Sequence, residues 1–135
     1  MTKYILLYAA TVPVFFLIDL VWLGVVARDF YRSQIGSLMA DPILWWAAIL
    51  FYLLFIAGII FFAVLPGLDA RSWTKALLLG AAFGFFAYMT YDLTNLATLQ
   101  GWPITLVVVD IAWGTVLAAS VATASYFIGT RIFGS

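Results

Sequence analysis

The feature that most constrains this chain is a succession of four apolar runs, each long enough to cross a lipid bilayer. A transmembrane helix needs about 20 mostly apolar residues, because each residue advances the helix by about 1.5 Å. The runs cover residues 4–27, 43–65, 75–99 and 103–128 and leave little besides short connections. We therefore predict an all-α, polytopic membrane protein, with four transmembrane helices in an antiparallel bundle and residues 1–135 forming a single domain.

The composition indicates that lipid is the surrounding solvent. Apolar residues make up 67% of the chain and charged residues 9%, whereas a soluble domain carries about 25% charged residues. A protein this small leaves much of its surface in contact with solvent, so such an excess cannot be hidden in a core. The sequence has no cysteine and no histidine, which excludes thiolate chemistry and removes the commonest ligand of zinc and haem. Nothing in the neutral net charge suggests a nucleic-acid partner.

Proline and glycine predict where the helices begin and end. Pro42 and Pro103 stand where the second and fourth helices should begin, because proline fits the first turn of a helix. Pro66 followed by Gly67 is expected to end the second helix. The connection at residues 99–102 is tight, which makes the third and fourth helices antiparallel neighbours.

Lysine and arginine in the connections predict the orientation of the chain. Four basic residues fall on one side of the membrane, and these are Lys3, Arg71, Lys75 and Arg131. The other side carries Arg28 and Arg32, which are expected to contact lipid headgroups. This excess places both termini in the cytoplasm, and we expect the protein to lie in a bacterial inner membrane.

Three aspartates lie inside the predicted helices, where an ionisable group costs a few kcal/mol on insertion scales. Asp92 and Asp110 each lie 9 positions from Gly101, in opposite directions along the chain. Asp19 lies 9 positions before Arg28, the first charged residue after the first run. At about 1.5 Å per residue, all three lie roughly 10 Å below the same membrane face. We expect the bundle to bring their carboxyl groups together in one buried layer.

The third helix carries a stripe of residues at intervals of three and four, small at one end and polar at the other. The stripe consists of Gly80, Gly84, Tyr88, Tyr91, Asp92 and Asn95. Its two glycines, four positions apart, permit the close approach of a neighbouring helix. Its tyrosine hydroxyls and its amide are expected to line a site around the carboxyl groups. The second helix carries no charge and is expected mainly to pack.

The first and fourth helices share a short pattern. Asp19 is followed by Trp22, and Asp110 by Trp113, each at a spacing of three residues. That spacing places an indole beside the carboxyl group of its own helix, where the indole N–H can donate to it. Both tryptophans are therefore expected to wall the site.

The sequence offers no counter-charge for this layer. No lysine, arginine or histidine lies at the depth of the three aspartates, and ionised carboxylates without a partner are unstable in a medium of low dielectric constant. The carboxyl groups must hold protons, bind a cation or line a water-filled cavity. Oxygen ligands suit Mg²⁺, Mn²⁺ or Ca²⁺ rather than zinc, so Asp19, Asp92 and Asp110 are candidate ligands if a divalent ion binds.

The motifs resemble a bacterial family of small predicted membrane proteins of unknown function. The resemblance rests on Asp19 with Trp22, residues 62–67, the Gly80 and Gly84 pair, residues 88–95, Trp102 with Pro103, and residues 110–114. The stretch Tyr-Asp-Leu-Thr-Asn at residues 91–95 is its most specific part. The resemblance implies a membrane protein of four helices and carries no activity with it.

Three functions stay open at this point. The first is proton- or cation-linked transport of a small solute by the aspartate layer, with a homodimer as the working unit. The second is a divalent-metal-dependent intramembrane enzyme whose lipid or isoprenoid substrate has its phosphate held by Arg28 and Arg32. The third is an accessory subunit of a larger membrane complex. Because no recognised catalytic motif is present, the sequence favours transport.

Overall fold

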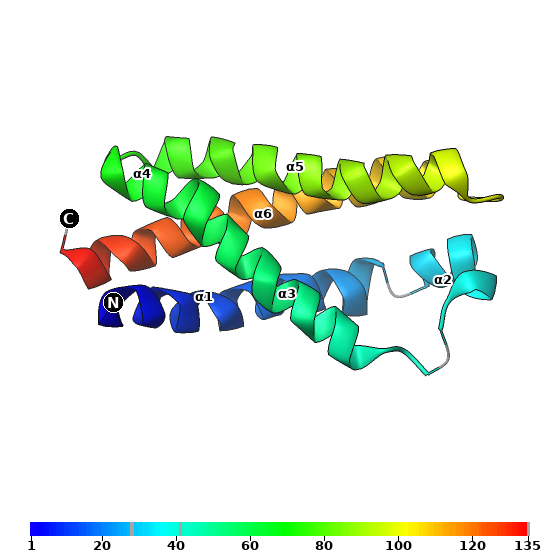
Figure 1. Cartoon of the computed structure of the whole chain (residues 1–135), viewed down its shortest axis with the longest axis horizontal. Coiled ribbons are helices and arrows are strands. Elements are labelled where there is room, and N and C mark those ends of the chain that lie inside the picture. Colours follow the sequence, from blue (N-terminus) through cyan, green and yellow to red (C-terminus); the bar gives the residue numbers. More distant parts are fainter. Residues whose placement is uncertain (28, 41, 135) are drawn as a thin grey trace.

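The computed structural model of the protein describes residues 1–27, 29–40 and 42–134. Figure 1 shows the long helices side by side, with both termini and the α4–α5 connection at one end and α2 at the other. The helices in chain order are α1 (Thr2–Val21), η1 (Trp22–Val26), α2 (Phe30–Ile35), η2 (Gly36–Leu38), α3 (Trp45–Ile59), η3 (Ile60–Val64), α4 (Leu65–Asp69), α5 (Trp73–Thr98) and α6 (Ile104–Phe133).

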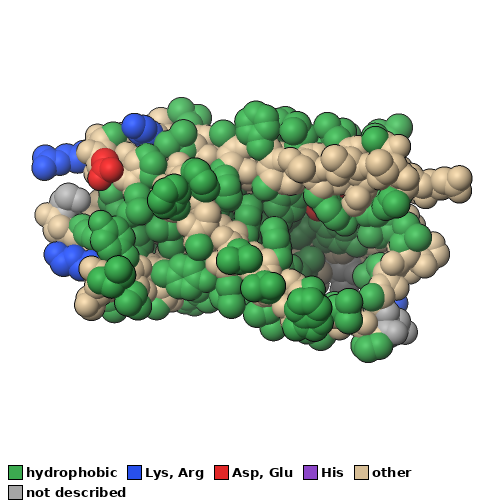
Figure 2. Space-filling view, viewed as in Figure 1, with side chains coloured by type: hydrophobic (Ala, Val, Ile, Leu, Met, Phe, Trp, Pro, Cys, Tyr) green, Lys and Arg blue, Asp and Glu red, His purple; other side chains and the backbone are tan. Residues whose placement is uncertain are grey.

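Four continuous stretches of helix in the described part of the chain are long and apolar enough to cross a membrane. They are Thr2–Val25, Trp45–Asp69, Trp73–Thr98 and Ile104–Phe133. Figure 2 shows apolar side chains along the length of the molecule and lysine or arginine side chains at its ends, as a membrane-spanning protein requires. The predicted all-α fold with four membrane-spanning helices is therefore confirmed.

The second span departs from the prediction at both ends. It begins at Trp45, because the chain turns at residues 43 and 44 after Pro42. It also continues through Pro66 and Gly67 as far as Asp69. The π-helical turn η3 comes directly before α4, and its wider hydrogen-bond pattern lets the chain pass a residue that has no N–H to donate. The prediction that Pro66 ends this span is wrong for that reason.

The last two spans begin as local chemistry requires. The side chain of Ser72 caps α5 by accepting a hydrogen bond of 3.1 Å from the backbone N–H of Lys75. Pro103 is followed directly by the first residue of α6, as predicted. The fourth span then runs five residues beyond its predicted end, to Phe133 rather than residue 128.

We call the half of the bundle that holds both termini the terminal half, which includes Leu7, Ile59 and Gly80. The interface of α5 with α6 is the largest helix–helix interface of the protein, and its Gly80 contact lies in this half. A Cβ added at Gly80 would lie 2.6 Å from the Cβ of Ala122, and one at Gly84 would lie 2.6 Å from the Cβ of Ala118. The two glycines therefore serve the close helix approach that their spacing predicts.

We call the other half the loop half, which includes α2, Asp19, Asp92 and Asp110. In Figure 1 α3 crosses the bundle obliquely and diverges from α5 toward this end. The aromatic contacts between these two helices end at Phe55, whose ring lies 5.3 Å from that of Phe83 and 5.9 Å from that of Tyr88, centroid to centroid. The short helix α2 packs on the start of α6, where Trp102, Leu106 and Val107 are buried. This half holds two cavities, one of which is bordered by α2.

Candidate functional site

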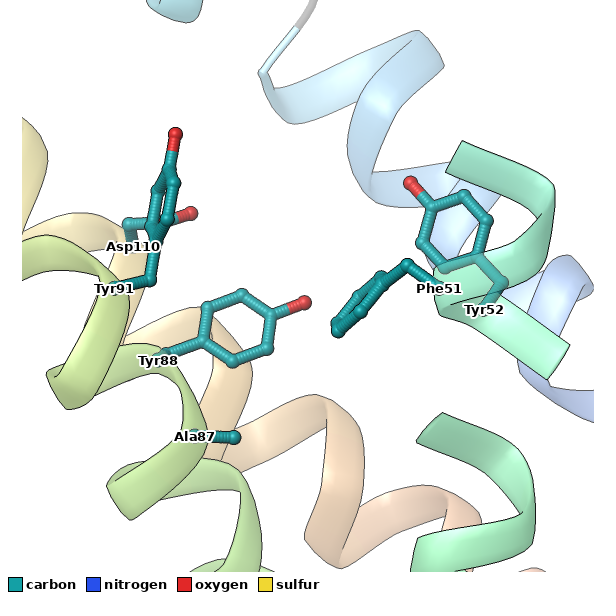
Figure 3. Close-up of a pocket in the computed structure, with 6 residues that line it drawn as sticks. All are labelled: Phe51, Tyr52, Ala87, Tyr88, Tyr91 and Asp110. Carbon is teal, nitrogen blue, oxygen red and sulfur yellow. The ribbon is translucent and has the colours of Figure 1, made fainter. Parts of the chain in front are cut away.

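The loop half is hollowed by two cavities that share a wall. The lateral cavity, of about 420 Å³, lies between α3 and α5 and is lined by Phe51, Tyr52, Ala87, Tyr88, Tyr91 and Asp110. In Figure 3 Tyr88, Tyr91 and Asp110 lie on one side of this space and Phe51 and Tyr52 on the other, with the Tyr88 hydroxyl pointing toward Phe51. The central cavity, of about 310 Å³, is lined by Asp19, Trp22, Leu23, Tyr31, Ile35, Met39, Tyr52, Tyr88, Asp110 and Trp113.

The three aspartates come from three different helices and are all buried. The exposed fraction of the residue is 5% for Asp19, 0% for Asp92 and 7% for Asp110. Asp110 borders both cavities and Asp19 borders the central one. Asp92 lines neither cavity and lies behind Asp110, beside Trp102. The structure thus places two of the carboxyl groups on cavity walls and the third in the protein interior.

Each of the two tryptophans donates its hydrogen bond to a residue on another helix. The Trp113 indole N–H donates to the Asp19 carboxylate over 3.3 Å. The Trp22 indole N–H donates to the Tyr31 hydroxyl over 3.2 Å, and that hydroxyl donates to Asp110 over 2.7 Å. The expected bond from each indole to the aspartate of its own helix is therefore wrong. The indoles instead stack face to face, with centroids 4.4 Å apart and an angle of 6° between the rings, and this stack directs each N–H elsewhere.

Tyr31 belongs to α2, in the connection between the first and second spans, and its side chain lines the central cavity. Burial, and after it the neighbouring Asp110, raises the pKa of Tyr31 above its usual value. The hydroxyl therefore keeps its proton and remains a hydrogen-bond donor. It supplies Asp110 with the strong, short bond that a carboxylate needs when it leaves water.

Asp92 is the least satisfied polar group of this half. Neither of its carboxylate oxygens makes a hydrogen bond, and the indole N–H of neighbouring Trp102 is also without a partner. The carboxyl group of Asp110 lies beside it. Among the described residues that line the two cavities there is no lysine or arginine. Such a pair of carboxyl groups is stable only when it holds a proton or another cation.

The family described as predicted membrane protein DUF2177 matches residues 4–127. That range includes every residue that lines the two cavities. The chain belongs to the DUF2177 family. The resemblance seen in the sequence is thus confirmed, and this DUF2177 member is an integral membrane protein. Among curated proteins and among solved structures, none matches the chain.

The candidate metal ligands are not gathered around one point in this DUF2177 protein. Across residues 1–27, 29–40 and 42–134, no group of three acidic, histidine or cysteine side chains lies close enough together to hold a metal ion. Asp19 accepts a hydrogen bond from Trp113, whereas Asp92 lies behind Asp110. The arrangement does not offer the ligand set that Mg²⁺, Mn²⁺ or Ca²⁺ would take from three carboxylates.

The remaining predicted site residues divide between the cavities and their surroundings. Tyr88 and Tyr91 line the lateral cavity, whereas Asn95 is half-buried on α5 and lines neither. Arg32 borders a third hollow, of about 400 Å³, next to Trp45 at the loop end of the molecule. The predicted headgroup contact of Arg28 lies outside the described residues.

Two polar residues of the site escaped the sequence analysis. Tyr52 borders both cavities, although the second helix was expected mainly to pack. A count of depth could have found it, because Tyr52 lies 10 positions after Pro42, close to the 9 that separate each aspartate from its own end marker. Tyr31 carries no comparable signal, since it lies in a connection whose path over the cavity depends on tertiary packing.

Proposed function

We propose that this protein transports a small solute across the membrane in a proton- or cation-linked cycle, with Asp110 and Asp19 carrying the exchanged charge. The observation that carries the proposal is the position of Asp110, which borders both cavities and, among the described residues, supplies the carboxyl group on the wall of the lateral cavity. A carboxyl group that joins two cavities inside a membrane is suited to bind a cation from one side and release it toward the other.

The surrounding residues fit this role. Tyr52 and Tyr88 share the wall between the cavities with Asp110, so a solute that moves from one cavity to the other must pass them. The hydrogen bond from Tyr31 stabilises Asp110 when no solute is bound. Asp92, directly behind, adds negative charge or a stored proton to the same site. Trp22 and Trp113 form an apolar wall that excludes water from the bond to Asp19.

Transport is better supported than the other two functions. A metal-dependent enzyme that acts on a lipid needs a ligand set, and the described side chains do not gather three ligands at one point. An accessory role predicts an unoccupied interface but does not account for two cavities that converge on a carboxyl group.

The proposal includes the topology and the number of chains. Four of the six basic residues lie at the terminal end, so we place both termini in the cytoplasm of a bacterial cell, with the loop half toward the outer face of the inner membrane. We propose that the functional form is a homodimer, because the four helices of one chain are too few to enclose a transport pathway. Since the sequence has no cysteine, single-cysteine variants at each end can report both features by labelling and cross-linking.

The experiment uses purified protein in liposomes loaded with a pH-sensitive dye. A pH gradient is imposed, and sodium, potassium, ethylammonium and tetraphenylphosphonium ions are added one at a time. We expect at least one of these ions to move protons through the wild type, with at least tenfold slower movement through Asp110→Asn. The matched control is Asp69→Asn, the same chemical change at an exposed position at the end of α4.

Two results would overturn the proposal. One is a proton movement that none of the four ions alters in the wild type. The other is an Asp110→Asn variant that matches the wild type with every ion. An intermediate rate for Asp19→Asn would fit the place of Asp19 on the central cavity alone.

A further inference from the structure

We propose that the solute is a lipophilic organic cation, and that it enters the lateral cavity sideways from the lipid, between α3 and α5. This substrate class rests on the transport function proposed above and narrows it. The lateral position of the cavity, the chemistry of its walls and the buried carboxyl group behind Asp110, which lacks hydrogen-bond partners, support it independently.

The entrance lies beside the acyl chains. The second span contacts α5 along η3 and α4 and through Phe55, which packs on Phe83 and Tyr88, whereas α3 diverges from α5 beyond these contacts. Tyr52 lies 7 positions into α3, and Asp110 lies 7 positions after Pro103. At about 1.5 Å per residue this is about 10 Å below the start of each span, inside a hydrocarbon core about 30 Å thick. Figure 2 shows a hollow between these helices with an acidic side chain at its floor.

The walls combine apolar surface with negative charge. Phe51, Tyr52, Tyr88 and Tyr91 present aromatic rings, whose faces attract cations. Asp110 adds a carboxyl group, and no described residue of this cavity is basic. An anion would be repelled here, and a hydrated metal ion would leave the aromatic surface unused. A cation with an apolar body matches both the rings and the carboxyl group.

The protein interior behind Asp110 reinforces this charge. Asp92 is fully buried, and both of its oxygens lack a hydrogen-bond partner. The site therefore holds more acceptors than donors, and the pair formed by Asp92 and Asp110 can be completed by one cation. A single positive charge at Asp110, either a proton or an organic cation, would correct the imbalance. Binding of one monovalent cation then releases one proton, so the charge balances at each step.

The test measures binding without any gradient, so it does not depend on transport. Protein in lipid nanodiscs is titrated with tetraphenylphosphonium, and tetraphenylborate serves as an anion of the same shape. We expect saturable binding of the phosphonium ion only, weakened at least tenfold in Asp110→Asn and unchanged in Asp69→Asn. Ala87→Phe, which fills the cavity between the two helices, should also weaken binding at least tenfold. Its control is Ala82→Phe, at an exposed position of the same helix.

The outcomes separate this inference from the function on which it rests. Equal binding of both ions, or unchanged binding in Asp110→Asn and Ala87→Phe, would overturn the substrate class. If sodium or ethylammonium moves protons through Asp110 while the phosphonium ion does not bind, transport stands and the substrate class is wrong. If the phosphonium ion binds at Asp110 and moves no proton, the substrate class stands and transport fails. Disulfide formation between two copies of Phe51→Cys would place a second copy over the entrance and overturn lateral entry.

Discussion

In the terminal half, glycine and alanine let α5 and α6 approach until a single added methyl group no longer fits. In the loop half, aromatic and acidic side chains hold the same four spans apart around two cavities. The two halves also treat buried polar groups differently. Thr11 and Ser125 in the terminal half are bonded to each other over 2.7 Å, whereas Asp92 in the loop half has no partner.

This difference indicates that one half of the bundle stabilises the fold and the other half holds the site. Close packing gains dispersion contacts, and the hydrogen bond between Thr11 and Ser125 satisfies two buried hydroxyl groups, so both stabilise the fold. Open space and unsatisfied acceptors cost stability, and proteins retain such features where a ligand binds. The terminal half is thus the structural base of the protein, and the loop half carries the site.

The largest change in stability is expected when a side chain is added to the close helix contact of the terminal half. Gly84→Val should lower the free energy of unfolding by about 3 kcal/mol, because overpacking a close helix contact forces the backbones apart. Denaturation of the detergent-solubilised protein, followed by circular dichroism, measures it. The control is Gly24→Val, where no atom lies within 4 Å of an added Cβ. Equal losses in the two variants would mean that the close contact between α5 and α6 does not stabilise the fold.

In the loop half, in contrast, we expect a substitution to increase the stability of the protein. Asp92→Asn should raise the free energy of unfolding by about 2 kcal/mol, since a buried carboxyl group without hydrogen-bond partners is costly and the new amide can donate to Asp110. The same denaturation experiment measures the gain, and Asp69→Asn at an exposed position should show none. A loss of stability in Asp92→Asn would contradict the view that this carboxyl group is kept at the expense of the fold.

The comparison of the halves also shows which features the sequence could predict. Hydropathy and helix geometry predicted the four spans, and the spacing of Gly80 and Gly84 predicted the contact that builds the terminal half. The error at Pro66 arose because a π-helical turn upstream accommodates a proline that would otherwise end the helix. Such a turn depends on hydrogen bonds that leave no mark in the residue pattern.

The loop half was harder to predict because its contacts join distant residues. Spacing placed Trp22 beside Asp19 and Trp113 beside Asp110, but the stack of the two indoles pairs Trp113 with the aspartate of the other helix. Which carboxyl group an indole reaches is decided by helix packing and not by its own helix. The burial of all three aspartates followed from their depth, whereas the part that Tyr31 plays required the fold of a whole connection.

The smallest effect concerns the buried hydroxyl pair of the terminal half. Thr11 donates its proton to the Leu7 carbonyl over 2.7 Å, so the Ser125 hydroxyl must be the donor between the two side chains. In a double-mutant cycle with Thr11→Val and Ser125→Ala, we expect a coupling of about 0.6 kcal/mol, because serine can instead donate to a carbonyl of its own helix. A coupling near 3 kcal/mol would make this pair as important as the glycine contact, and the terminal half would then depend on hydrogen bonds as much as on close packing.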